Sequence, residues 1–378
     1  MAIRVLHVAE AAGGVERYLE LLLKYSPNNE VENILICSQH FNTEKIKNYA
    51  KVNQIEMSHK FDLKIDLRAI SEIRKYIKTY LPDLVYAHST KAGALVRIAC
   101  LGLPVPVLYN PHGWAFNMGH SNLKKTAYKF IEKVQSKFTK RYILISQAEK
   151  ESALKSKITD IKKISVIDNG IDFDEFKAKD DISREKLGIP KNAFVIGQVG
   201  RLVEQKSPDV FVKAAKLVKE NIPNSFFVLV GNGDQEPFIR ELIRSEGLGE
   251  CCIITGWVEN PVSYMKLFDV GTLLSRWEGF GLVLAEYMYS KVPIVATKID
   301  AIPYVVEDRK DGLLVNKDSV AAVAQAIMEI HDNKKLAEEL IDNGYEKAVK
   351  KYDGRRVSTE TTTVYKEVMG ESIDQSIT

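Results

Sequence analysis

Short apolar runs alternate with amphipathic stretches along most of the chain. Eleven runs are rich in β-branched residues and have the length of strands: IRVLHVA, VENILICS, DLVYAH, VPVLYN, RYILIS, KISVID, AFVIGQVG, SFFVLVG, CCIITG, DVGTLLS and VPIVAT. Helix-length segments lie between them, for example at 66–80, 122–138, 206–221 and 234–246. This alternation predicts an α/β fold of parallel sheets that are covered by helices on both faces.

A polar stretch, DNGIDFDEFKAKDDISREKLGIPKN, interrupts this pattern near the middle of the chain. It contains Gly170 and Pro190, which are typical of a connection between domains. Because 378 residues suffice for two domains of ordinary size, we expect an N-terminal domain at 1–170 and a C-terminal domain at 171–353. The segment 354–370 follows the last predicted strand and is expected to pack back on the first domain.

The composition is that of an ordinary globular protein, with 45% apolar and 27% charged residues. No apolar stretch approaches the ~20 residues that cross a bilayer. The start, MAIRVLHVAEAAGG, has the pattern of a first strand and lacks that of a signal peptide. The cysteines Cys37, Cys100, Cys251 and Cys252 have no metal-site or C-x-x-C spacing. We therefore expect a cytoplasmic protein with unpaired thiols.

Charge is distributed unevenly along the chain. Residues 1–165 hold 26 Lys and Arg against 15 Asp and Glu, a net charge of +11, whereas the rest carries −8 of a total of +3. A basic half of a nearly neutral protein indicates an anionic partner for that half. Nucleic acid, a membrane surface and a phosphorylated substrate all fit this observation.

Two loops of the second half could bind a diphosphate. In doubly wound sheets, ligands bind beyond the carboxyl ends of the strands. The run AFVIGQV leads into GRLVEQKSPD, where Arg201 and Lys206 flank a predicted helix start and could neutralise phosphates. The run SFFVLV leads into GNGDQEPF, in which Gly231 and Gly233 begin a G-x-G pattern. Glu236 stands where the dinucleotide fingerprint requires its third glycine, which weighs against NAD.

The loop after DVGTLLS, with the sequence RWEGFGLVLAEYM, combines glycines with carboxylates. Gly279 and Gly281 allow backbone amides to approach a phosphate closely. Glu278 is expected in the turn, where it could accept hydrogen bonds from sugar hydroxyls. Glu286 is expected inside the following helix, where it could bind a ribose diol. The alternative is an ordinary helix with Glu286 on its exposed face.

Three further candidate features lie in the first half and in the connection. Gly13 and Gly14 open a predicted helix whose N-terminus could meet an anion, or they form a plain strand–helix turn. His112 follows a strand in YNPHGWAF, a position typical of a functional side chain. Asp172 and Asp174 resemble a metal-binding D-x-D, but turn and capping roles are the preferred interpretation. The sequence has no G-x-S-x-G, zinc-ligand or P-loop pattern.

Six of these motifs occur in one order: GGVER, HGWAF, NGID, GRLVEQKS, VGNGDQE and EGFGLVLAE. This set resembles the retaining family 4 glycosyltransferases of GT-B fold, among them hexosyltransferases of bacterial surface-polysaccharide and capsule synthesis. The resemblance covers residues 3 to about 350. It implies two Rossmann-like domains that face each other across a cleft, an acceptor-side N-terminal domain and a nucleotide-sugar-binding C-terminal domain. Ser207 departs from the glycine that the family often has at that position.

The resemblance also implies roles for individual residues. It assigns His112, Glu278, Arg201 and Lys206 to catalysis, with His112 near the transferred sugar. It assigns donor binding to Gly13, Gly14, Arg201, Lys206, Gly231, Gly233, Glu278, Gly279, Phe280, Gly281, Leu282 and Glu286. No metal and no cofactor beyond the nucleotide sugar, a UDP-sugar by this resemblance, is implied. The implied mechanism is front-face attack, in which the departing diphosphate helps to deprotonate the acceptor.

The segment SNLKKTAYKFIEKVQSKFTKRY carries six lysines and one arginine against a single acid, Glu132. Its apolar residues Tyr128, Ile131, Val134 and Phe138 recur at helical spacing. One hypothesis is that this basic amphipathic helix docks on the inner face of the cell membrane, where a polyprenyl-diphosphate-linked acceptor is bound. The alternative is a solvated helix whose apolar stripe is part of the core.

The sequence therefore predicts a retaining, metal-independent glycosyltransferase that moves a sugar from a nucleotide sugar to a lipid-linked glycan. A nucleotide-sugar-modifying enzyme of the same fold, such as an epimerase, is the alternative within the fold. A nucleic-acid-binding protein is suggested only by the basic first half, and no recognition motif supports it. A catalytically inactive partner subunit is disfavoured because Arg201, Lys206, Glu278 and Glu286 are all present.

Overall fold

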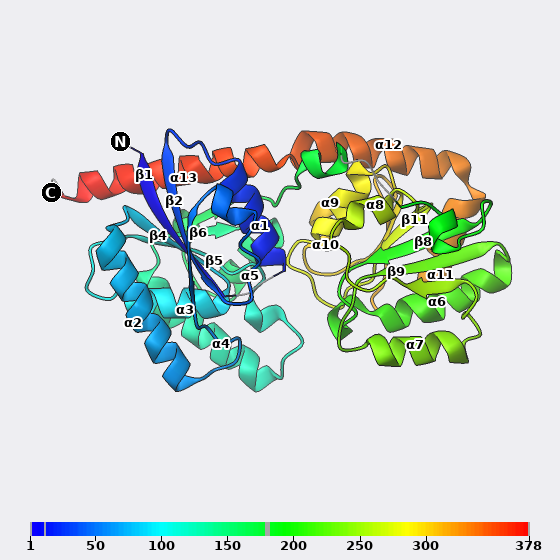
Figure 1. Ribbon diagram of the computed structural model, residues 1–378, viewed down its shortest axis with the longest axis horizontal. Coiled ribbons are helices and arrows are strands. Elements are labelled where there is room, and N and C mark those ends of the chain that lie inside the picture. The colour runs from blue at the N-terminus through cyan, green and yellow to red at the C-terminus, as the bar shows by residue number, and fades with distance from the viewer. Residues whose placement is uncertain (1, 11–12, 178–181, 377–378) are drawn as a thin grey trace. The chain divides into compact units, whose positions relative to one another are not determined.

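The chain forms two compact units (Figure 1). Unit 1 comprises Met1–Gly170 and Gly354–Thr378, and unit 2 comprises Ile171–Asp353. The computed structural model describes residues 2–10, 13–177 and 182–376, so residues 178–181 of the expected connection lie outside the described residues. The chain thus passes from unit 1 to unit 2 after Gly170 and returns to unit 1 at Gly354.

Unit 1 is built on a seven-stranded sheet in the order β3-β2-β1-β4-β5-β6-β7. All of its strand pairs are parallel. The strands are β1 (Ile3–Ala9), β2 (Val31–Ser38), β3 (Lys51–Ile55), β4 (Leu84–His88), β5 (Val107–Asn110), β6 (Arg141–Leu144) and β7 (Ile164–Val166). The chain adds strands on one side of β1 and then on the other, so the order reverses between β1 and β4.

Helices cover the sheet of unit 1. They are α1 (Gly14–Lys24), α2 (Leu63–Tyr80), α3 (Thr90–Ala99), α4 (Asn122–Gln135), α5 (Gln147–Lys155) and α13 (Gly354–Ser376). Helices α2 and α3 contact each other and share a core with Leu6 and Val8 of β1. Helix α13 packs against α1, so the last helix of the chain belongs to the first unit (Figure 1).

Local signals explain several helix starts. The carboxylate of Asp62 accepts hydrogen bonds from the backbone amides of Lys64 and Ile65 at the start of α2. The hydroxyl of Ser146 does the same for Glu149 at the start of α5. In both cases a polar side chain satisfies amide groups that the first helical turn leaves without a partner.

Unit 2 contains a six-stranded parallel sheet in the order β10-β9-β8-β11-β12-β13. Its strands are β8 (Phe194–Val199), β9 (Ser225–Val230), β10 (Cys252–Ile254), β11 (Val270–Leu273), β12 (Ile294–Thr297) and β13 (Leu313–Val315). Its helices are α6 (Pro208–Asn221), α7 (Glu236–Ser245), α8 (Pro261–Met265), α9 (Leu282–Tyr289), α10 (Ile302–Val305), α11 (Val320–Asp332) and α12 (Lys334–Lys351). Helix α6 packs with α7 and α11, whereas α9 packs with α12 (Figure 1).

The described residues contain thirteen strands, so the count of eleven from the sequence was wrong by two. The missing strands, β3 and β13, each lie at one edge of a sheet, whereas β7 and β10 at the opposite edges were predicted. In β3 the residues Lys51, Asn53 and Gln54 are polar, and β13 has only three residues. An edge strand has a neighbour on one side only, and its weaker apolar pattern is difficult to recognise.

The four cysteines are buried and unpaired, as their spacing indicated. Within the described residues, no helix combines the length and the apolar character that crossing a membrane requires.

Candidate functional site

The loops after β8 and β11 of unit 2 meet at the point where its strand order reverses. The chain adds β9 and β10 on one side of β8, and then β11, β12 and β13 on the other. The loop after β8 carries Arg201 and Lys206, and the loop after β11 carries Glu278. A switch point of this kind is where open α/β sheets bind their ligands.

Lys206 and Glu278 form an ion pair between these two loops. Their side chains are only 17% and 11% exposed. The Ser275 hydroxyl donates a second hydrogen bond to the same carboxylate over 3.0 Å, and the backbone amide of Glu278 donates to the carboxylate of Asp300. Glu278 is therefore held at both its side chain and its backbone.

The backbone around Lys206 is also fixed. The side-chain amide of Gln198 donates to the carbonyl of Lys206 over 3.0 Å. Ser207 has a left-handed backbone with φ of 51° and is fully buried, and Pro208 starts α6 directly after it. A left-handed residue costs little only when it is glycine, which explains why a glycine would suit the position of Ser207.

Arg201 differs from Lys206 because its side chain is exposed to solvent. It lies 3.5 Å from the side-chain oxygen of Gln205. A partly exposed network restrains the same region through Arg276, which pairs with Asp209 over 2.9 Å and with Asp318 over 2.7 Å. Arg201 thus supplies a solvent-accessible cation beside a rigid loop.

Gly231 and Gly233 follow β9 at close approaches of the backbone. A Cβ atom on Gly231 would lie 2.2 Å from the carbonyl oxygen of Gly200, and one on Gly233 would lie 2.2 Å from that of Leu202. The loop after β9 therefore packs directly on the loop that leads to Arg201. Only glycine fits at these two positions without a shift of the backbone.

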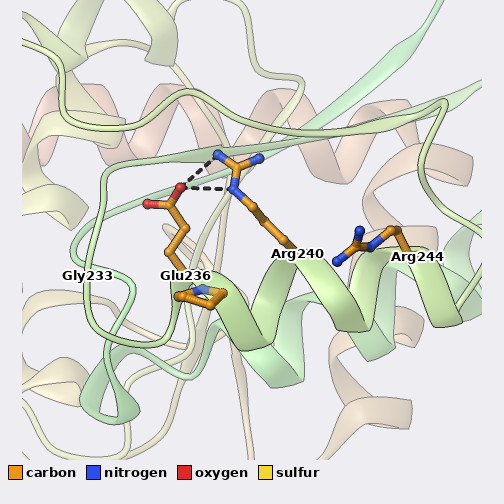
Figure 2. Close-up of a pocket in the computed structure, with 5 residues that line it drawn as sticks. Gly233, Glu236, Arg240 and Arg244 are labelled. Atoms are coloured by element: carbon orange, nitrogen blue, oxygen red, sulfur yellow. Dashed lines mark hydrogen bonds and ion pairs between the residues drawn. The ribbon is translucent and has the colours of Figure 1, made fainter.

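Gly233 also lines a surface pocket with Glu236, Pro237, Arg240 and Arg244 of α7. Figure 2 shows Glu236 and Arg240 joined by an ion pair, with Arg244 one turn further along the helix. The Nε and Nη2 groups of Arg240 both donate hydrogen bonds to the Glu236 carboxylate, over 2.9 and 2.7 Å. This pairing occupies Glu236, the residue at the third-glycine position of the G-x-G pattern.

The loop after β11 ends at the start of α9. Gly281 has φ of 85° and forms the N-cap of α9, with Leu282 as its first residue. Phe280 is buried against Tyr352. Gly279 is half-buried and Gly281 is buried, and the positive end of the helix dipole lies at this turn.

Glu286 lies inside α9 and is 2% exposed. The alternative that it sits on an exposed helix face was therefore wrong. A carboxylate is rarely buried without a specific function or partner.

In unit 1, Gly13 has φ of 79° and caps α1, whose first residue is Gly14. Both glycines are exposed, and a Cβ atom on either would meet no atom within 4 Å. The positive φ of Gly13 favours glycine at that position. A side chain at position 14 would extend into open space.

His112 follows β5 with a left-handed backbone, φ 50°. Its amide donates to the Asn110 side-chain oxygen over 2.9 Å, and the amide of Gly113 donates to the carboxylate of Glu149. The ring of His112 lies 3.1 Å from that of His88. Burial raises the pKa of Glu149 to about 7, against the opposing effect of two backbone amide donors. A strained backbone held from several sides is typical of a functional position.

Asp172 and Asp174 take part in local contacts of the segment that follows Gly170. The carboxylate of Asp172 accepts a hydrogen bond from the backbone amide of Asp174 over 3.0 Å, and Asp174 pairs with Lys177 over 2.8 Å. These contacts are the turn and capping roles that the sequence favoured.

The sequence did not single out Ser275, Asp300, His88 or Glu149. Ser275 and Asp300 follow β11 and β12, so the rule that ligands lie beyond strand ends could have included them. His88 is a histidine at the end of an apolar strand, which is a usable signal. Glu149 is an acid in the first turn of a helix, and nothing in the sequence distinguishes it from an ordinary one.

Helix α4 has an unusual distribution of side chains. Its one buried residue is an acid, Glu132, which pairs with the buried Arg97 over 2.9 Å. Tyr128 is half-buried against the core. Along α4 and the turn that follows it (Ser136–Phe138), the apolar side chains Leu123, Phe130, Ile131, Val134 and Phe138 are 44–83% exposed, and the lysines Lys124, Lys129, Lys133 and Lys137 are exposed with them. We call these nine residues the α4 surface.

Comparison with known proteins identifies the family of the chain. Residues 12–175 match the family model described as Glycosyltransferase Family 4, and residues 179–347 match the one described as Glycosyl transferases group 1. The chain is 30% identical to the UDP-Gal:alpha-D-GlcNAc-diphosphoundecaprenol alpha-1,3-galactosyltransferase of Escherichia coli, over 88% of this chain and 89% of that protein. It is 24% identical to the capsular polysaccharide biosynthesis glycosyltransferase CapM of Staphylococcus aureus, over 84% and 87% of the two chains.

Solved structures support the fold. HepE of Anabaena in complex with UDP matches with a TM-score of 0.82 at 20% identity, over 97% of this chain and 100% of that chain. WaaG, a glycosyltransferase involved in lipopolysaccharide biosynthesis, matches with a TM-score of 0.76 at 14% identity, over 96% and 99%. Two family models that together span most of the chain, and two parallel-sheet units of Rossmann type, establish that the chain belongs to the family 4 glycosyltransferases of GT-B fold.

Proposed function

We propose that this glycosyltransferase transfers a sugar from a UDP-sugar to a polyprenyl-diphosphate-linked glycan during synthesis of a surface polysaccharide. The donor is supported by the E. coli relative, whose name gives UDP-Gal, and by the UDP bound to HepE. The acceptor is supported by the same relative, whose name gives a diphosphoundecaprenol-linked sugar. The CapM name places a second relative in capsule synthesis.

The observation that carries the proposal is the Lys206–Glu278 pair at the switch point of unit 2. A lysine ammonium has three N–H donors, so Lys206 can bind a phosphate while it still contacts Glu278. Arg201 adds a second cation that solvent can reach. In this proposal Arg201 and Lys206 bind the donor diphosphate, because hydrogen bonds from a cationic side chain to a phosphate are stronger than neutral ones.

The remaining donor contacts follow along the loop after β11. Glu278 and the amides from Gly279 to Leu282 hold the sugar and its phosphates, and Glu286 accepts hydrogen bonds from the ribose hydroxyls. Gly231 and Gly233 keep the neighbouring loop close to Arg201. In unit 1, Gly13, Gly14 and His112 are the residues that this proposal assigns to the donor.

The reaction proceeds with retention and without a metal ion in this proposal. The acceptor oxygen attacks the anomeric carbon on the face from which the diphosphate departs. The bond between that carbon and the phosphate oxygen breaks, and the acceptor proton passes to the departing phosphate oxygen. Arg201 and Lys206 stabilise the charge that develops on the diphosphate.

A transfer assay on the full-length protein tests this function. UDP-galactose, UDP-glucose and UDP-N-acetylglucosamine are each supplied with an undecaprenyl-diphosphate-linked N-acetylglucosamine, with and without EDTA. We expect a product whose new linkage has the α configuration of the donor by NMR, formed equally well in EDTA. A β linkage, or activity lost in EDTA and restored by Mn²⁺, would overturn the mechanism.

Two control reactions separate this function from its alternatives. An altered UDP-sugar in the absence of acceptor would identify an epimerase-like enzyme and overturn the transfer. Thermal shifts with UDP-, GDP-, ADP- and dTDP-sugars identify the nucleotide, because a ligand that binds the folded state raises Tm. A larger shift with any nucleotide other than UDP would overturn the choice of donor.

The α4 surface supports a membrane location for the acceptor in this proposal. Its five exposed apolar side chains lie beside four exposed lysines, and α4 is fixed to unit 1 by the buried Arg97–Glu132 pair. Lysines near an anionic bilayer contribute about 1 kcal/mol each, and apolar side chains add to this by burial in the interface. The α4 surface therefore docks on anionic lipid in this proposal.

Vesicle sedimentation tests the docking. Wild-type protein is expected to sediment with vesicles of phosphatidylglycerol and phosphatidylcholine but not with phosphatidylcholine alone. Lys124→Glu with Lys129→Glu, and separately Leu123→Ser with Phe130→Ser, should each weaken binding at least tenfold. Lys334→Glu reverses an exposed charge on α12 and is the matched control. No binding to anionic vesicles at any salt concentration would refute the docking.

A further inference from the structure

Three histidine rings of unit 1 form a continuous hydrogen-bonded chain. His7 lies in β1, His88 ends β4, and His112 follows β5. His7 Nδ1 lies 3.2 Å from His88 Nε2, and His88 Nδ1 lies 3.1 Å from His112 Nε2. At the inner end, His7 Nε2 lies 3.1 Å from the Oδ1 atom of Asn33, a residue of β2.

The inner part of this chain is closed to solvent. His7 and His88 are 0% exposed, and Asn33 is 8% exposed. The rings of Tyr18 and Tyr86 pack against His88. Burial lowers the pKa of His7 to about 4 and that of His88 well below its usual 6.5. Both rings are therefore neutral at pH 7, and each carries a single N–H group.

The amide oxygen of Asn33 gives the chain a direction. A neutral imidazole donates from one nitrogen and accepts at the other, and an amide oxygen only accepts. His7 therefore donates from Nε2 to Asn33, and its Nδ1 accepts from Nε2 of His88. In the same way, Nδ1 of His88 accepts from Nε2 of His112.

This order leaves His112 with its proton on Nε2 and a lone pair on Nδ1. The position of the ring is fixed as well, because the left-handed backbone of His112 is held by Asn110 and the next amide by Glu149. A strained backbone persists only where its surroundings enforce it. The outer nitrogen of His112 is thus a hydrogen-bond acceptor of fixed orientation.

We propose that Asn33, His7 and His88 are positioning residues that hold His112 as its Nε2–H tautomer, so that its Nδ1 accepts a hydrogen bond from a hydroxyl of the substrate sugar. The hydroxyl contact rests on the proposed function, whereas the tautomer is a property of unit 1 alone. The hydrogen-bonded histidines select for a sugar hydroxyl that donates a hydrogen bond, because Nδ1 of His112 carries no proton. Loss of any inner member lets His112 exchange between its two tautomers.

The tautomers are read directly by ¹⁵N NMR of the full-length protein labelled at histidine. Spectra of His7→Gln, His88→Gln and His112→Gln assign the three rings. We expect all three wild-type rings to carry their proton on Nε2. Protons on Nδ1 would mean that Asn33 presents its NH₂ group to His7, and that result would overturn the proposal.

Asn33→Leu tests the positioning at a distance, because Asn33 does not touch His112. We expect the His112 signals to report both tautomers and kcat/KM for the donor to fall about three- to tenfold, the range for one lost hydrogen bond. Asn53→Leu is the matched control. Asn53 lies on the neighbouring strand β3 and accepts a hydrogen bond from the Tyr80 hydroxyl, outside the histidine chain.

The two readouts separate this proposal from the function on which part of it rests. An unchanged His112 tautomer in Asn33→Leu would overturn the positioning role, even if kcat/KM fell. Conversely, a shifted tautomer in a protein that transfers no sugar would support the positioning role and overturn the function. If Asn33→Leu does not fold, the wild-type spectrum alone decides the tautomer.

Discussion

The ion pair between Lys206 and Glu278 joins the loops that follow the two neighbouring strands β8 and β11. Glu278 is restrained by Ser275 and by Asp300, and Lys206 by the contact of Gln198 with its carbonyl group. The pair therefore arranges a cation and an anion before any substrate binds, which lowers the cost of ordering them later.

Replacing Lys206 by alanine is expected to impair the enzyme. The substitution removes a charge-assisted bond of about 1.5–3 kcal/mol to the diphosphate, and it leaves the carboxylate of Glu278 without its cation. We expect kcat/KM to fall roughly 10- to 150-fold, measured with the donor that shifts Tm. Arg201→Ala should lower kcat/KM by a similar factor, because it removes the second cation.

Lys310→Ala is the matched control for this prediction. Lys310 pairs with Glu307 over 2.8 Å, but both side chains are about 60% exposed. An exposed pair of this kind is screened by solvent and contributes little to stability, so kcat/KM and Tm should remain close to wild type. Wild-type turnover in both Lys206→Ala and Arg201→Ala would refute the assignment of the diphosphate site.

Gly231→Ala is expected to destabilise unit 2 and to impair donor binding. The added Cβ atom would lie 2.2 Å from the carbonyl oxygen of Gly200, and the backbone of Gly231 has φ of 133°. Overpacking and backbone strain together should cost about 2–4 kcal/mol. Urea unfolding measures this loss. Gly249→Ala is the control, because a Cβ atom there meets no atom within 4 Å, and equal losses in the two variants would contradict the prediction.

The sequence was sufficient to locate the candidate site because its residues follow strands in an alternating fold. Arg201, Lys206 and Glu278 could be selected from the rule that ligands lie beyond the carboxyl ends of parallel strands. That rule says nothing about pairing between loops. The contact of Lys206 with Glu278 depends on which strands are neighbours, and the linear order β8, β9, β10, β11 does not reveal that β11 lies beside β8.

The histidine chain of unit 1 shows a second limit of the sequence. His7 and His88 occur in runs that are otherwise apolar, where a single polar residue carries little weight. Their contact requires the register in which His7 lies opposite Tyr86 and His88 opposite Ala9. A sequence pattern predicts which residues form a strand, whereas the register between two strands is a tertiary property.

The buried Arg97–Glu132 pair predicts a large loss of stability in Arg97→Met. The side chains of both residues are at most 3% exposed, and Tyr109 donates to the same carboxylate over 2.9 Å. Removing the cation leaves a buried, uncompensated carboxylate, which costs about 3–5 kcal/mol in the free energy of unfolding. Adding Glu132→Gln should restore more than half of this loss, because the amide is neutral and its oxygen still accepts from Tyr109. Equal stability of the single and double variants by urea unfolding would contradict this account.

Glu149 predicts a specific pH dependence of stability. Its pKa in the folded protein is about 7, above the usual 4.5, so the folded state binds this proton more tightly than the unfolded chain does. The stability that this group contributes is complete below pH 4.5 and is lost as the pH rises to about 7. A difference of this size corresponds to about 3 kcal/mol.

Comparison of wild type with Glu149→Gln isolates this effect. His7 acts in the opposite sense, because its lowered pKa makes its contribution complete above pH 6.5 and lost as the pH falls to about 4. Both proteins carry His7, so its effect cancels in the difference between their free energies of unfolding. That difference should change by about 3 kcal/mol in favour of the variant between pH 4.5 and 7, measured by urea unfolding. Glu151→Gln, which removes an exposed carboxylate from the same helix, is the control. Parallel curves for wild type and Glu149→Gln would show that the carboxylate holding the His112 loop does not titrate in this range.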